Sequence, residues 1–188
     1  MKNEKTKRLV VAAVLSALII VFQLMVELIP ITFVKFTPVL APIILGGALY
    51  GKKMGAFLGF VFSVVVLCIP STQAFFAVDV LATIIIVLAK GTLGGFLAAC
   101  VYDLLSKKTA IGGVIAAGIV MPAVNTGIFV LGASFFFLPV FGIDASKGGL
   151  AAIVPIFLII AINFIIELAI NMVLSTGIVT AIKATKKF

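Results

Sequence analysis

Histidine and tryptophan are absent from this 188-residue sequence, and acidic residues and cysteines are few. Without His, the chain lacks the commonest general base and metal ligand of proteins. Cys68 and Cys100 lie in apolar stretches without a paired spacing, which indicates small core residues and not a disulfide or a metal site. We therefore predict that the protein has no metal site.

Two nucleotide-binding and catalytic motifs are also missing. The sequence has no Gly-x-x-x-x-Gly-Lys-Ser/Thr loop, which would cradle the phosphates of ATP, and no Gly-x-Ser-x-Gly motif, which would present a nucleophilic serine. These absences predict that the chain is not an enzyme and uses no cofactor. Energy for any transport would then come from partner proteins or from an ion gradient.

Charged residues make up 11% of the sequence, against about 25% in an ordinary soluble domain. Eleven of the 14 basic residues gather in four short clusters, which are separated by long apolar stretches. They are Lys2, Lys5, Lys7, Arg8, Lys52, Lys53, Lys107, Lys108, Lys183, Lys186 and Lys187. Basic residues accumulate at the cytoplasmic ends of membrane spans. The pattern predicts a multi-pass membrane protein whose net charge of +8 faces lipid headgroups and not nucleic acid.

The apolar stretches predict one all-α domain over residues 1–188, a bundle of six transmembrane helices with both termini in the cytoplasm. A helix needs about 20 residues to cross the hydrocarbon core, and open sheet edges cannot lie in lipid. The predicted spans are residues 9–29, 38–50, 54–69, 80–105, 110–132 and 150–182. We expect a tight inner turn at Gly51-Lys52-Lys53 and an irregular or tilted second span.

The predicted outer connections lie at 30–37, 70–73 and 139–149, and phenylalanines gather in and around them. These phenylalanines are Phe33, Phe36, Phe75, Phe76, Phe135, Phe136, Phe137 and Phe141. They form either an aromatic belt at the membrane interface or a lid over a binding cavity. The sequence leaves both interpretations open.

Ionisable residues inside a membrane are costly and indicate function. Lys90 lies near the middle of the fourth span and Glu167 near the middle of the sixth. Asn163, Glu167 and Asn171 recur every four residues, which places them on one stripe of a helix. Lys90 either neutralises Glu167 or receives a ligand carboxylate. For Asn171 we favour a structural role in hydrogen bonding between helices.

Asn125 and Thr126 follow Pro122 by about one turn in the outer half of the fifth span. Pro122 has no backbone donor, so the carbonyl of Gly118 is left without its helical partner. An Asn side chain both donates and accepts, which suits a ligand amide or hydroxyl. The predicted substrate-binding residues are Lys90, Asn125, Thr126, Asn163, Glu167 and, from the second outer loop, Gln73.

Small residues recur every four positions in two places. Ala13-x-x-x-Ala17 gives the first span a flat face, and such spacing permits close approach of another helix. Gly51, Gly55 and Gly59 repeat in the same way, and Gly91, Gly94 and Gly95 thin the fourth span. For these glycines we predict packing within the bundle.

Taken together, the chain resembles the substrate-binding S component of an energy-coupling factor (ECF) vitamin transporter. Four features carry the resemblance. They are the Ala13–Ala17 face, the Gly51-Lys-Lys-Met-Gly55 turn, the Lys90-Gly-Thr-Leu-Gly-Gly95 stretch and Pro122-Ala-Val-Asn-Thr-Gly-Ile-Phe129. The resemblance implies a vitamin-capturing subunit of an ABC importer in the bacterial plasma membrane. It also implies a transmembrane coupling protein that docks on Ala13 and Ala17, two cytoplasmic ATPases, and a ligand site in the outer half of the bundle.

Pantothenate is the substrate that we expect within this family. A flexible, non-aromatic acid with hydroxyl and amide groups suits Lys90, Asn125 and Asn163, and the chain has no Trp and two Tyr for stacking an aromatic vitamin. Riboflavin and folate remain alternatives. Outside the family, the alternatives are a stand-alone secondary transporter, which would usually carry an internal repeat, and a small membrane enzyme that uses Glu167 as a base.

Overall fold

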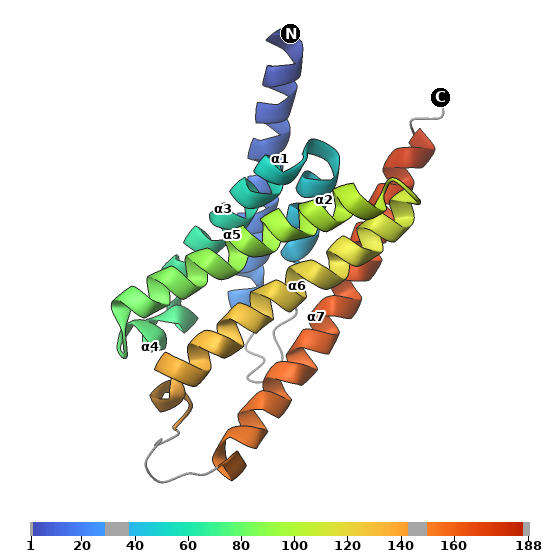
Figure 1. Cartoon of the computed structure of the whole chain (residues 1–188). Helices are drawn as coiled ribbons and strands as arrows, with labels where there is room; N and C mark the ends of the chain where they lie inside the picture. The colour runs from blue at the N-terminus through green and yellow to red at the C-terminus, as the bar shows by residue number, and fades with distance from the viewer. Residues whose placement is uncertain (1, 29–37, 143–149, 186–188) are drawn as a thin grey trace.

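The computed structural model describes residues 2–28, 38–142 and 150–185, and these residues form helices joined by short connections (Figure 1). The predicted outer connection at 30–37 and most of the one at 139–149 lie outside the described residues. The helices, in chain order, are α1 (Lys2–Leu28), α2 (Leu40–Tyr50), α3 (Lys52–Cys68), η1 (Pro70–Thr72), α4 (Gln73–Phe76), α5 (Val80–Leu105), α6 (Ala110–Phe136), η2 (Leu138–Phe141) and α7 (Leu150–Thr185). The predicted all-α class is confirmed for this part of the chain.

Four of the helices are long and apolar enough to cross a membrane, and they lie in α1, α5, α6 and α7. A fifth span is obtained when α3 is joined to the segment Pro70–Phe76, although the two are bent by 77°. The chain is therefore a multi-pass membrane protein with four or five membrane-capable helices among its described residues.

The second predicted span is the short helix α2, whose 11 residues rise by about 16 Å, roughly half of the hydrocarbon core. Seven of its residues are buried, and it contacts α1, α3, α5, α6 and α7. The short helix is thus enclosed by the longer ones. Its hydrophobicity reflects burial in the protein core at least as much as exposure to lipid.

Local signals set the helix ends. Gly51 separates α2 from α3 with a φ of 88°, a left-handed conformation that suits glycine. The chain changes direction between α2 and α3 at this single residue. Lys52 and Lys53 therefore belong to α3, and the predicted three-residue turn is wrong. Asp79 accepts a hydrogen bond of 2.9 Å from the backbone N–H of Ala82 and thereby caps α5.

Two further boundaries differ from the prediction. The fifth predicted span ended at residue 132, whereas the helix α6 continues to Phe136, since no proline lies between residue 132 and Pro139. The first span was predicted from residue 9, and the helix α1 that contains it already begins at Lys2, since the basic segment before the apolar stretch consists largely of good helix formers. The fourth span, in contrast, has the predicted bounds 80–105.

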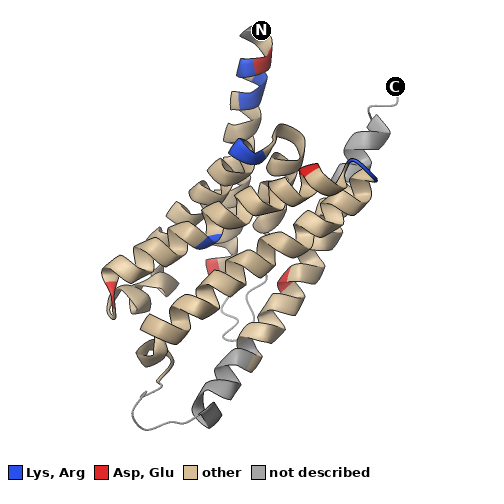
Figure 2. Cartoon of the chain, viewed as in Figure 1, with Lys and Arg blue, Asp and Glu red and all other residues tan. Residues whose placement is uncertain are grey.

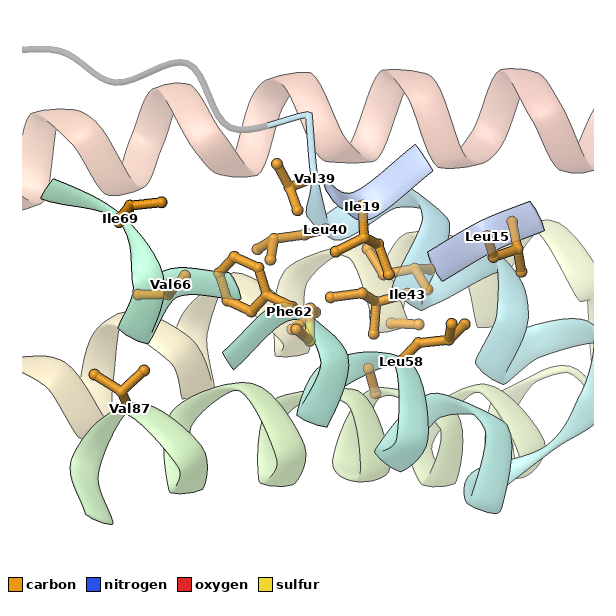
Figure 3. Packing of buried hydrophobic residues seen from close by; sticks show 14 residues of the cluster. Leu15, Ile19, Val39, Leu40, Ile43, Leu58, Phe62, Val66, Ile69 and Val87 are labelled. Carbon is orange, nitrogen blue, oxygen red and sulfur yellow. The ribbon is translucent and has the colours of Figure 1, made fainter. Parts of the chain in front are cut away.

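One hydrophobic core joins the first half of the chain to α5. Leu15 and Ile19 of α1 meet Ile43 of α2 and Leu58 and Phe62 of α3, all of them buried (Figure 3). The buried positions on α1 recur every four residues, so one face of this helix packs inward and the opposite face stays uncovered.

α3 and α5 approach each other through glycines. A Cβ built on Gly55 would overlap the carbonyl oxygen of Gly95, and one built on Gly59 would overlap that of Gly91. The reverse substitutions at Gly91 and Gly95 would meet the carbonyls of Gly59 and Gly55. The predicted packing role of these four glycines is confirmed, because the two backbones touch where the side chains are absent.

The basic clusters that the structure describes lie at one end of the bundle. Figure 2 shows them at the start of α1 and at the α2–α3 and α5–α6 connections. Lys52 at the start of α3 lies 3.8 Å from the carboxylate of Asp103 on α5. Both side chains are about half exposed, so this ion pair contributes little to stability.

Replacing Gly59 with Ala should destabilise the bundle. The added methyl group collides with the backbone of Gly91, which cannot rotate away as a side chain can. We expect a lower midpoint of thermal unfolding in detergent, equivalent to about 1–3 kcal/mol. The matched control is Gly177→Ala, where the Cβ meets nothing within 4 Å and the higher helix propensity of Ala should leave stability equal or slightly raised. Equal midpoints for the two variants would contradict the proposed backbone contact.

Candidate functional site

A cavity of about 410 Å³ lies between the helices and under the segment from η1 to α4. Its wall takes residues from α1, α3, α5, α6 and α7, so it is closed by parts of the chain far apart in sequence. Most of the wall is apolar. The polar residues in it are Gln23, Ser71, Thr72, Thr83, Lys90, Asn125, Asn163 and Glu167. The volume lies within the ordinary range for small-molecule sites.

One end of this cavity carries the charges. A smaller pocket of about 240 Å³ is lined by five of the six predicted site residues, together with three apolar neighbours. The five are Lys90 of α5, Asn125 and Thr126 of α6, and Asn163 and Glu167 of α7. Three consecutive long helices therefore bring these side chains to one place.

Lys90 and Glu167 both line this pocket. The Lys90 Nζ lies 5.3 Å from the ring centroid of Phe129, within the range of a cation–π contact. Glu167 is 9% exposed and close enough for its charge to act on Lys90. A cation and a carboxylate thus share one wall, and the positive group is partly stabilised by an aromatic face.

Among the polar residues of the charged pocket, Asn125 has a side-chain oxygen without a hydrogen-bond partner in the described part of the chain. It is 9% exposed, and its Oδ1 atom has no hydrogen-bond partner within the described residues. Buried polar atoms without a partner are rare and need an explanation. Because Asn125 lines the cavity, a bound molecule with a donor group would supply one.

Asn171 behaves differently from Asn125. It is fully buried, and its Nδ2 donates a hydrogen bond of 2.8 Å to the backbone carbonyl of Glu167, one turn earlier in α7. It does not line the cavity. The expected structural role fits this placement, but the hydrogen bond seen here lies within α7 and not between helices.

Phenylalanines close the end of the cavity opposite the basic clusters. The Phe75 ring of α4 packs edge to face against Phe129, Phe137 and Phe141, with centroid distances of 5.7, 5.0 and 6.1 Å. All four rings line the cavity. Phe135 and Phe136 are exposed instead. Of the eight phenylalanines singled out in the sequence, Phe75, Phe137 and Phe141 line the cavity, Phe135 and Phe136 are exposed, and Phe76 is half-buried outside the cavity wall. Phe33 and Phe36 lie outside the described residues.

Gln73 is the predicted site residue that the structure does not bring to the cavity. Its neighbours Ser71, Thr72 and Phe75 line the wall, whereas Gln73 is exposed at the start of α4. Its position between two predicted spans could be read from the sequence, but the direction of its side chain could not.

Sequence reasoning missed Gln23 of α1, which is 5% exposed and lines the cavity. The signal was present, because Gln23 continues the four-residue spacing of Leu15 and Ile19 along the buried face of the helix. A polar residue in register with a core stripe must face protein or a cavity.

Ala13 and Ala17 lie on the opposite side of α1 from this buried stripe. Both are exposed, and the face around them is apolar, with Val10, Val14 and Val21 each at least half exposed. Within the described part of the chain, no other helix covers this surface. It therefore faces either lipid or a partner.

The charged pocket has the composition of a binding site for a small polar molecule. No group of three or more His, Cys, Asp or Glu side chains that could hold a metal ion is found in the described residues. The residues at the charged pocket supply one cation, one carboxylate and several hydrogen-bonding groups, which suits selective capture of a small polar molecule.

The contrast between the two asparagines can be measured as stability. Asn125→Leu removes a buried amide oxygen that has no partner within the described residues, so we expect the free energy of unfolding without ligand to rise, since such groups cost about 1–3 kcal/mol. Asn171→Leu removes a hydrogen bond at a fully buried site and should lower it. Thermal unfolding of both variants in detergent tests this. A loss of stability for Asn125→Leu as large as that for Asn171→Leu would show that Asn125 is a structural residue.

The comparison with protein families found a match that covers most of the chain. The model of the family described as ECF transporter, substrate-specific component, matches residues 7–181. Searches of curated proteins and of solved structures gave no match. The matched region contains all the helices that line the cavity, apart from their outermost residues. The chain therefore belongs to the ECF transporter substrate-specific component family and is a membrane-embedded, substrate-binding subunit of such a transporter.

Proposed function

We propose that this subunit captures pantothenate and presents it for import. The observation that carries the proposal is the charged pocket, which is lined by the cation of Lys90 and by Asn125, whose Oδ1 atom has no hydrogen-bond partner within the described residues. A carboxylate would pair with Lys90, and an amide N–H of the ligand would donate to Asn125 Oδ1. Charge-assisted hydrogen bonds of this kind are among the stronger ones in proteins.

The carboxylate of Glu167 narrows the choice further. Its presence beside Lys90 favours a ligand with one negative charge and several neutral polar groups over a ligand with two negative charges, because a second carboxylate would meet Glu167. Pantothenate has one carboxylate, one amide and two hydroxyls. Folate has two carboxylates, and riboflavin has none, so each fits this pocket less well.

The proposed orientation follows the positive-inside rule. In our proposal six segments cross the membrane. Both termini, Lys52-Lys53 and Lys107-Lys108 face the cytoplasm, and the end of the cavity that is closed by the rings of Phe75, Phe129, Phe137 and Phe141 faces the outside. The proposed partners are a transmembrane coupling protein and two cytoplasmic ATPases, which would supply the ATP-dependent step.

We further propose that the coupling protein docks on the surface around Ala13 and Ala17. Both residues are exposed and one turn apart, so their small side chains would let a second helix approach closely. The chain's own helices pack against the opposite face of α1, through Leu15 and Ile19.

The substrate proposal is tested by calorimetry on the detergent-solubilised protein with pantothenate, riboflavin and folate. We expect pantothenate to bind in preference to the other two, and Lys90→Met to lose about 1.5–3 kcal/mol, or roughly ten- to hundredfold in affinity. Tighter binding of riboflavin or folate would overturn the substrate.

The variant Lys90→Met with Glu167→Gln serves as the control for charge neutralisation. If Lys90 contacts the carboxylate of pantothenate, the double variant should still bind weakly. If Lys90 only neutralises Glu167, the double variant should recover both stability and affinity. Full recovery would exclude contact between Lys90 and the ligand.

The docking proposal is tested with Ala17→Leu. The larger side chain should keep the partner helix from approaching, so the coupling protein should no longer co-purify, while pantothenate affinity stays unchanged. Ala123→Leu is the matched control, since Ala123 is also an exposed alanine on a membrane-capable helix, α6. Retained co-purification with Ala17→Leu would place the docking surface elsewhere.

A further inference from the structure

The cavity has two ends of different chemistry. The smaller pocket, which holds Lys90 and Glu167, does not include Gln23, Thr72 or Thr83. These three residues line the larger cavity, which also contains the residues of the charged end except Thr126 and Phe164. A molecule that fills the larger cavity would therefore contact the charged residues with one part and the Gln23 region with another.

The hydroxyl donors in the second region are already used by the protein. Thr72 Oγ1 donates to the carbonyl of Val66 at 2.5 Å, and Thr83 Oγ1 donates to the carbonyl of Asp79 at 2.6 Å. A threonine hydroxyl that donates to the backbone retains only acceptor capacity. This part of the wall therefore offers acceptors to a bound molecule.

Gln23 adds a buried acceptor to the same region. Its side chain is 5% exposed, and its Oε1 atom has no hydrogen-bond partner within the described residues. The residue lies on the buried stripe of α1, among Leu and Ile residues. An apolar side chain would fill the space without the free-energy cost of burying an oxygen that has no partner. An apolar packing role thus does not explain a glutamine here, whereas a ligand donor would.

The backbone around Gln23 is held in place by a neighbouring contact. Glu27, one turn later in α1, accepts hydrogen bonds from the backbone N–H of Ser71 at 3.0 Å and from its hydroxyl at 3.1 Å. Ser71 itself lines the cavity. This contact joins the end of α1 to η1, and Gln23 and Ser71 line the same cavity.

We propose that Gln23 is a specificity-determining residue, whose Oε1 accepts a hydrogen bond from a hydroxyl group at the uncharged end of the substrate. The inference rests on the proposed capture of a carboxylic acid at Lys90, and it adds the requirement for a donor at the other end of that acid. In pantothenate the two hydroxyls lie at the end opposite the carboxylate. The protein would thereby reject acids that match the charged end but lack the hydroxyls.

The test compares two probes on the full-length protein in detergent. The first is pantothenate, and the second is its analogue in which both hydroxyls are replaced by hydrogen. We expect Gln23→Leu to weaken pantothenate binding roughly two- to tenfold, as for the loss of one neutral hydrogen bond, and to leave the affinity for the analogue unchanged or slightly higher. Gln23→Met, which keeps the length of the side chain, should do the same.

Gln73→Leu is the matched control, because it makes the same change at an exposed glutamine outside the cavity wall. It should change neither affinity. Lys90→Met should weaken both probes, because both retain the carboxylate. An equal loss for the two probes with Gln23→Leu would show that Gln23 only shapes the cavity, and would overturn the inference.

The outcomes also separate this inference from the substrate proposal. If the unaltered protein binds pantothenate and Gln23→Leu has no effect, the role of Gln23 is wrong and the substrate stands. If the unaltered protein binds neither probe, both the substrate and the role assigned to Gln23 are wrong. Thermal unfolding of each variant establishes that the protein remains folded.

Discussion

The direct contact between the backbones of α3 and α5 determines how the rest of the bundle is arranged. Gly91 of α5 must face Gly59 of α3, because any larger side chain would separate the two helices. Successive residues of a helix point about 100° apart, so this contact also fixes the direction of Lys90. The lysine is turned toward α6, where it lies over the Phe129 ring. A packing constraint on one face thereby orients a charged residue on another.

The buried polar residues of the bundle differ in how their side chains are hydrogen-bonded. Ser63, Thr83 and Asn171 donate hydrogen bonds to backbone carbonyls one turn earlier in their own helices, and such bonds make them compatible with a buried position. Asn125 and Gln23 retain oxygen atoms without a partner, and both line the cavity. In a membrane an unpartnered polar atom is costly. Ser16 Oγ and Ser175 Oγ also lack a partner within the described residues, but neither residue lines the cavity. The combination of an oxygen without a partner and a place in the cavity wall therefore points to a ligand at Asn125 and Gln23, and a ligand that fills these sites should stabilise the protein.

Hydrophobicity and charge clusters were sufficient to predict the helical class and most helix positions, because long apolar segments in lipid have few alternatives to a helix. They did not predict that α2 would be enclosed by other helices, since a buried helix and a lipid-facing helix are equally apolar. The residues at the charged pocket were found because Lys90 and Glu167 have no other reason to lie in an apolar segment. Gln23 was absent from the predicted site because the alanine face at Ala13 and Ala17 was the feature of the first span from which a function was predicted. Gln73 was included because a loop position does not reveal which way a side chain points.

α1 is one continuous helix from Lys2 to Leu28, and it carries two features on different sides. Gln23 faces the cavity, and Ala17 lies about 9 Å earlier along the axis on the uncovered side. A straight helix turns as a rigid rod, so a pull on one side chain is transmitted to every other side chain along it. Any shift of α1 that accompanies filling of the cavity must therefore move the alanine surface by the same rotation. α1 therefore links the interior of the bundle, at Gln23, mechanically to its outer surface, at Ala17.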